Sequence, residues 1–146
     1  MAQGKALVVG GAGGIGNAIS VALAQAGIES ALIGRNKETL TATAGKCIAA
    51  GANAFPIVCD ISQIATIEAT VSEAIQKLGG LNYLINCAGL SICGKLHEAD
   101  LDGCDAILDT NLRSHYYLAR YALPEINKYP GGAVIKIGAV NHPQSG

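Results

Sequence analysis

Short apolar runs alternate along the chain with longer segments whose apolar residues recur at helical spacing. The apolar runs are short and nearly continuous, which is typical of strands buried on both faces. Five predicted strands follow from them, at residues 6–9, 30–33, 54–59, 81–86 and 133–137. Pro56 lies inside the third run. Because proline is tolerated best in an edge strand, this strand is expected at the edge of the sheet.

The segments between the strands predict helices, because their apolar residues recur every three or four positions. The predicted helices lie between the glycines at 10–16 and Ala26, and at residues 37–50, 62–77 and 101–128, the last as a short helix that continues into a longer one. Ser62 is expected to cap the third helix, since its hydroxyl can bind a free helical N–H. Glycines at 27, 51 and 79 are expected to end the first three.

Strands and helices alternate throughout, without an internal linker, repeat or low-complexity segment. This order predicts an α/β fold, a Rossmann-type doubly wound parallel sheet of five strands in the order 3-2-1-4-5 with helices on both faces. The length of 146 residues fits one domain. Ligands of such sheets bind at the carboxyl ends of the strands. That edge would bring together Gly10, Arg35, Asp60, Asn86 and Ala139.

Composition narrows the possible functions. Half of the residues are hydrophobic and 14% are charged, as in a globular chain. The formal net charge of -1 gives no electrostatic reason to expect nucleic acid or an acidic membrane surface as a partner. No apolar stretch approaches the length of a membrane span, and the N-terminus lacks the pattern of a signal peptide. Five cysteines without a C-x-x-C pair predict reduced thiols, a cytoplasmic location and no metal site.

The most informative stretch is KALVVGGAGGIG, residues 5–16, in which a strand ends in closely spaced glycines before a helix. Such glycines allow a tight turn, a close approach of the backbone to phosphates, and close packing of the helix on the strand. A P-loop is excluded, because Asn17 stands where its lysine would be needed. The stretch predicts a pyrophosphate-binding loop at the start of a helix. Its candidate contacts are Gly10, Gly11, Gly13, Gly14, Ile15 and Gly16.

Arg35 follows the second predicted strand, where a carboxylate would bind the ribose 2′-hydroxyl of NAD and an arginine would instead accept a 2′-phosphate. We therefore expect NADP(H) to be favoured over NAD(H), with Arg35 and its neighbour Asn36 as contacts. An S-adenosylmethionine-dependent methyltransferase also has glycines after its first strand. It would need an acid at this position, so Arg35 argues against it.

The chain resembles the short-chain dehydrogenases/reductases, which are single-domain Rossmann enzymes. The matching motifs are Gly10-x-x-x-Gly14-x-Gly16, Cys59-Asp60-Ile61-Ser62, Asn86-Cys87-Ala88-Gly89 and Asn111-Leu112. The resemblance implies that Asp60, with Ile61, contacts the adenine. It also implies that Asn86, Ala88 and Gly89 support and line the cofactor cleft, and that Asn111 anchors the water of a catalytic proton relay.

The chain also departs from this family. Val9 replaces a threonine, and Cys87 replaces the second asparagine of an Asn-Asn-Ala-Gly motif. Ala139 stands at the expected position of the catalytic serine, and no Tyr-x-x-x-Lys pair follows it. By this resemblance, residues 1–146 are an incomplete, truncated domain that binds the cofactor and is inactive or very weak alone.

Two functions stay open at this point. The first is the cofactor-binding part of an NADP(H)-dependent oxidoreductase, which would act on a small carbonyl or alcohol substrate if completed. The second is a non-catalytic nucleotide-binding or subunit-interaction protein with the same fold. The predicted edge position of strand 133–137 favours self-association in either case. His97 and His115 have no partner at a telling spacing, whereas His142 lies near the expected cleft.

Overall fold

The computed structural model describes residues 4–91 and 94–138. Its five strands form one parallel sheet in the order β3-β2-β1-β4-β5, which confirms the predicted fold class and strand order. The strands are β1 (Lys5–Val9), β2 (Glu29–Gly34), β3 (Ala54–Val58), β4 (Tyr83–Asn86) and β5 (Ala133–Lys136).

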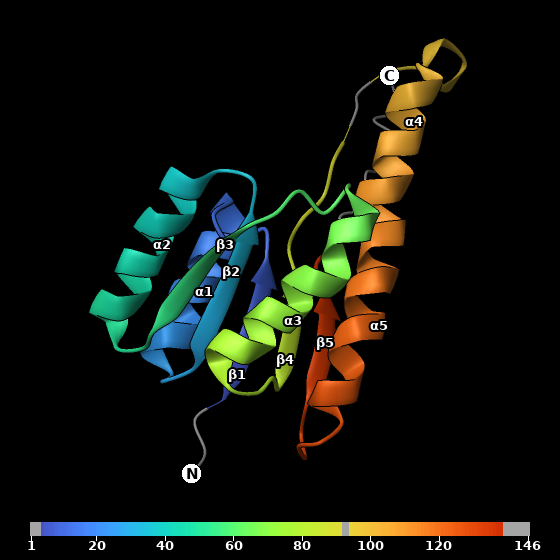
Figure 1. Ribbon diagram of the computed structural model, residues 1–146. Helices are drawn as coiled ribbons and strands as arrows, with labels where there is room; N and C mark the ends of the chain where they lie inside the picture. The colour runs from blue at the N-terminus through green and yellow to red at the C-terminus, as the bar shows by residue number, and fades with distance from the viewer. Residues whose placement is uncertain (1–3, 92–93, 139–146) are drawn as a thin grey trace.

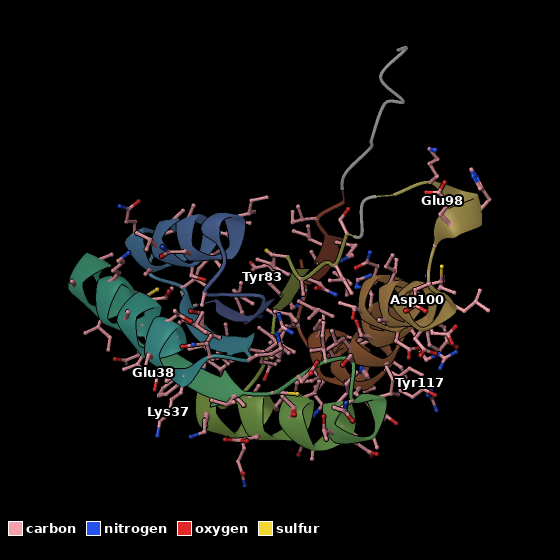
Figure 2. All side chains as sticks on the ribbon, turned by 90° about the horizontal axis from the view of Figure 1, so that it is seen from above. Lys37, Glu38, Tyr83, Glu98, Asp100 and Tyr117 are labelled. Carbon is pink, nitrogen blue, oxygen red and sulfur yellow. The ribbon has the colours of Figure 1, made fainter. Side chains whose placement is uncertain are left out.

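Helices cover both faces of this sheet (Figure 1). The α-helices are α1 (Gly14–Gln25), α2 (Lys37–Ala50), α3 (Ile67–Leu78), α4 (Leu101–Leu108) and α5 (Ser114–Ile126). Three shorter segments are the 3-10 turns η1 (Ile64–Thr66) and η2 (Leu96–Glu98) and the π-helical turn η3 (Asp109–Arg113). Figure 2, seen from above the view of Figure 1, shows α1 and α2 on one side of the sheet and α3 and α5 on the other.

Alternation along β1 divides the core into two clusters. Ala6 and Val8 belong to the cluster that contains α1 and α2, whereas Leu7 and Val9 belong to the cluster that contains α3 and α5. All four side chains are at most 1% exposed. Burial of a leucine or valine side chain contributes about 1.5–3 kcal/mol to the stability of the fold. The buried side chains of β1 therefore fix the position of the strand from which the next loop begins.

The predicted edge position of β3 is confirmed, but the predicted start of the next helix is not. Pro56 pairs with Leu32 of β2, and within the described residues β3 has no second neighbour. The expected cap of α3 by Ser62 is wrong. The Ser62 hydroxyl instead donates to Oδ1 of Asp60 at 2.7 Å, and α3 begins only at Ile67 after the η1 turn. The nearby carboxylate of Asp60 competes for Ser62, as short polar side chains do in turns.

The predicted helical segment 101–128 is a long rod in which η3 joins α4 to α5, and α4 projects beyond the carboxyl edge of the sheet (Figure 1). A π-helical turn of this kind is rare and is frequent at functional sites. Within residues 4–91 and 94–138, no helix combines the length and the apolar character that crossing a membrane requires.

Candidate functional site

A cavity of about 540 Å³ opens at the carboxyl edge of the sheet. It lies where the strand order reverses, because β1 pairs with β2 on one side and with β4 on the other. Eight residues of the predicted site line it: Gly10, Gly13, Arg35, Asn36, Asp60, Ile61, Ala88 and Gly89. The other described candidates do not form its wall: Gly11, Gly14, Ile15, Gly16, Asn86 and Asn111. Ala139 and His142 lie outside the described residues.

Two glycines of the loop are required by packing within the protein. Gly10 has a φ of 77°, and a Cβ there would lie 3.0 Å from the backbone nitrogen of Ala88. A Cβ on Gly16 would lie 1.9 Å from the carbonyl oxygen of Gly10, which is far inside van der Waals contact. These two positions allow the turn after β1 and the close packing of α1 against it.

Among the described residues, no side chain caps the N-terminus of α1. Gly13 is the N-cap residue and makes no side-chain hydrogen bond, and the first turn contains no acidic residue. A Cβ on Gly14 would meet no atom within 4 Å, and the Ile15 side chain is 59% exposed. The first amides of a helix lack intrahelical acceptors, and the helix dipole makes this end positive. The N-terminus of α1 therefore fits an external anion such as a pyrophosphate.

The cavity wall that follows β2 is positively charged as well. Arg35 lines it, is exposed, and forms no ion pair with any other described residue. Asn36 caps α2, because its Oδ1 accepts a hydrogen bond from Thr39 N at 3.0 Å. Among the described residues, Asp60 supplies the single carboxylate of the wall, and its Oδ1 accepts from the N–H and the hydroxyl of Ser62. Asp60 follows β3, the strand that pairs with β2, so this carboxylate lies on the same side of the cavity as Arg35 and is engaged by Ser62.

The loop after β4, residues 87–90, forms another wall of the cavity and is held by side chains. The fully buried Asn86 accepts from Ala88 N through Oδ1 at 3.0 Å. The side chain of Asn111, in the π-helical turn, accepts from Leu90 N and donates to Leu90 O, both at 2.7 Å. Both polar groups of Asn111 are thus engaged with the loop. Its predicted catalytic role stays a prediction, and its side chain has a supporting role.

Two residues that the sequence did not single out as site residues lie behind this loop. Lys136 Nζ donates to the carbonyl oxygen of Ala88 at 2.6 Å, and His115 Nδ1 lies 3.3 Å from Nδ2 of Asn86. Burial, and then the charge of Lys136, lower the pKa of His115, which favours the neutral ring. A lysine within the apolar run AVIKI was a usable signal for Lys136. His115 gave none, because its partner is 29 residues away.

Electrostatic effects around Lys136 oppose one another. Burial lowers the pKa of Lys136, whereas the negative charge of Cys87 in its thiolate form raises it. Burial raises the pKa of Cys87, and the charge of Lys136 lowers it. Since burial is the larger cause for Cys87, the neutral thiol is favoured in the wall of the cavity.

Comparisons with known proteins agree with this architecture. The family model described as short chain dehydrogenase matches residues 4–145. A short chain dehydrogenase of Pseudocercospora fijiensis is 36% identical over 141 residues, which cover 94% of this chain and 46% of the relative. The chain spans about half the length of this relative.

Two solved structures are similar over nearly the whole chain. A short-chain dehydrogenase/reductase from Serratia marcescens is 31% identical with a TM-score of 0.88, covering 93% of this chain and 55% of that one. An NADH-dependent reductase in complex with NAD is 27% identical with a TM-score of 0.87, covering 94% of this chain and 60% of that one.

Proposed function

Because the chain belongs to the short-chain dehydrogenase family of oxidoreductases, we propose that its cavity binds a nicotinamide dinucleotide for hydride transfer. The observation that carries this proposal is the uncapped N-terminus of α1, whose N-cap Gly13 lines the cavity. The open side of Gly14 supports it, since a phosphate could approach the backbone there. The related reductase in complex with NAD supports the same class of ligand.

NADP(H) is the cofactor we favour. Arg35 lines the cavity at the end of β2, beside the positive N-terminus of α2. A guanidinium there can pair with a 2′-phosphate. The one carboxylate of the described wall, Asp60, is engaged by the N–H and the hydroxyl of Ser62. A charge-assisted contact of this kind is worth about 1.5–3 kcal/mol, which corresponds to an affinity ratio of about 10 to 100.

Calorimetric titration with NADPH and NADH tests both parts of this proposal. The wild-type protein should bind NADPH more tightly, and Arg35→Asp should remove or reverse the preference. Lys46→Asp is the matched control, because it makes the same charge change on the exposed side of α2 and leaves the cavity wall intact. Absence of binding to either nucleotide would contradict the site. Equal affinities, unchanged by Arg35→Asp, would contradict the preference.

The reaction we propose moves hydride between the nicotinamide and a small carbonyl or alcohol. The family supports it, and so does the π-helical turn η3 beside the loop wall, since such turns are frequent at functional sites. The 146 residues contain no Tyr-x-x-x-Lys pair after Ala139, so binding and not turnover is the property to test on this chain. A reducing compartment such as the cytoplasm is our proposal for its location, based on the odd number of cysteines.

Self-association is a further part of the proposal. Within the described residues β5 pairs with β4 alone, so its other edge is open. A second candidate surface runs along α4, η3 and α5, where large apolar side chains are exposed. We call it the rod stripe, and it consists of Leu101, Leu108, Leu112, Tyr116 and Leu123.

The rod stripe is complementary to a second copy of itself. If two copies pair antiparallel about Leu112, Leu101 faces Leu123 and Leu108 faces Tyr116. The same pairing brings Asp102 near Arg120, and Asp109 near Arg113 of the other copy, so opposite charges flank the apolar contact.

Sedimentation velocity at micromolar concentration tests this pairing. Leu112→Glu should give monomers, because it puts two carboxylates at the centre of the contact. Ile48→Glu, at an exposed apolar position on α2, is the control and should leave association unchanged. A wild-type protein that sediments as a monomer would contradict self-association.

A further inference from the structure

The cavity wall formed by residues 87–90 takes its shape from contacts behind it. Asn86 binds the N–H of Ala88, Lys136 binds its carbonyl, and Asn111 binds both backbone groups of Leu90. Four side-chain hydrogen bonds from three elements thus hold a loop whose own residues line the cavity. Asn86 and Asn111 belong to the family motifs Asn86-Cys87-Ala88-Gly89 and Asn111-Leu112, whereas Lys136 belongs to neither.

Lys136 is the one charged group among these anchors. It lies at the end of β5, directly opposite Asn86 in the sheet register, and is partly buried. Its Nζ lies 2.6 Å from the Ala88 oxygen, and within the described residues it forms no ion pair with a carboxylate. An ammonium on a carbonyl makes a stronger hydrogen bond than a neutral donor. The Ala88 carbonyl is therefore the main polar contact of the partly buried Lys136 ammonium.

Ala88 in turn touches the phosphate loop. A Cβ on Gly10 would come within 3.0 Å of the Ala88 nitrogen and 3.2 Å of its Cα, so these two backbones are in direct contact. A shift of Ala88 would change the space beside Gly10, which lines the same cavity. Lys136 is thereby connected through Ala88 to the turn that precedes α1.

We propose that Lys136 is a positioning residue, whose ammonium fixes the Ala88 carbonyl and so sets the separation between the loop 87–90 and the Gly10 turn. Lys136 does not line the cavity, and it acts through the backbone that does. Its effect on nucleotide affinity rests on the proposed function, whereas its effect on the loop does not.

Amide hydrogen exchange in the free protein tests the effect on the loop. Lys136→Met keeps a long side chain and removes the donor, and it should raise exchange at Ala88 and Leu90 about tenfold, or about 1.4 kcal/mol. Lys136→Arg retains a charged donor and should restore most of the protection. Lys77→Met, which removes an exposed lysine of α3, is the control and should change nothing there. Unchanged exchange in Lys136→Met would overturn the proposal.

Titration of the same variants with NADPH tests the effect on the site. Lys136→Met should bind about tenfold more weakly at unchanged stoichiometry, and Lys136→Arg should recover part of the loss. Faster exchange with unchanged affinity would overturn the link to the cavity. If the wild-type protein does not bind NADPH, the proposed function fails, and the exchange experiment still decides the role of Lys136. If Lys136→Met is unfolded by thermal melting, Lys136→Gln replaces it. This variant removes the charge and shortens the side chain, so it should also raise exchange at Ala88 and Leu90, and unchanged exchange would overturn the proposal.

Discussion

Helices α1 and α2 lie on the same face of the sheet, and their N-cap residues line one cavity, but within residues 4–91 and 94–138 only α2 has a side-chain cap. Asn36 accepts a hydrogen bond from Thr39 N, and Glu38 adds a negative charge to the first turn of α2. Lys37 and Glu38 lie at the outer surface near the start of this helix (Figure 2). At α1, Gly13 offers no side chain, and the first turn contains no acid.

The difference in capping between α1 and α2 suggests a role for Gly13, the N-cap residue of α1. An uncapped helix end is less stable than a capped one, since its first amides have no acceptor from the protein. Asn36 shows that the chain caps a neighbouring helix in the usual way. The N-terminus of α1 lacks this stabilisation, and its first amides and the positive end of its dipole lie next to Gly13 in the cavity wall. We interpret it as the part of the site that an anionic group of the ligand completes.

The largest effect is expected where the loop packs against itself. Gly16→Ala would place a Cβ 1.9 Å from the Gly10 carbonyl oxygen, so α1 must move away from the turn. We expect the free energy of unfolding to fall by about 3 kcal/mol. Gly14→Ala is the matched control within the same helix turn, because its Cβ meets no atom within 4 Å. Urea unfolding of both variants measures the difference, and equal stabilities would contradict the packing described for Gly16.

The next largest effect is expected from a substitution that gives α1 an N-cap like that of α2. Gly13→Asp supplies the missing cap, and the extended backbone at Gly13, with φ -70° and ψ 169°, accepts a side chain. The free energy of unfolding should rise by a few tenths of a kcal/mol. NADPH should bind about 10 to 100 times more weakly, because a carboxylate then lies where a phosphate should bind. Calorimetry checks this result, and undiminished affinity would place the phosphates elsewhere.

The smallest effect is expected from a substitution that removes the N-cap of α2, so that this helix is uncapped like α1. Asn36→Ala removes the acceptor for Thr39 N, and the free energy of unfolding should fall by about 1 kcal/mol. Thermal melting of this variant beside Thr41→Ala, an exposed substitution farther along α2, isolates the cap from general effects on the helix. A loss no greater than that of Thr41→Ala would show that the cap contributes little.

Most of the fold could be predicted from the sequence because its signals are local. The limits of α2 agree with the prediction for residues 37–50, since Asn36 starts that helix and Gly51 ends it. Pro56 indicated an edge strand, and β3 lies at the edge. The start of α3 was missed because two polar residues compete there, and Asp60 binds Ser62 before it can cap a helix.

The candidate site was less predictable, since much of it depends on contacts between distant residues. The glycine loop and Arg35 were accessible, because a motif and its spacing place them. The contact of Lys136 with Ala88 joins residues 48 positions apart, and the contact of Asn111 with Leu90 joins residues 21 apart. No local pattern contains such pairs, and they follow only once β4, β5 and the rod are packed together.

Chemical-shift mapping shows directly whether the nucleotide binds at the start of α1. In a titration of the ¹⁵N-labelled protein with NADP⁺, we expect the largest amide shifts at Gly14, Ile15 and Gly16, the first residues of α1. The Thr39 amide, already bound by Asn36, should shift less. Saturable shifts centred on the start of α1 would agree with pyrophosphate binding at its free amides. Shifts that spare residues 14–16, or none at millimolar nucleotide, would contradict binding at this helix N-terminus.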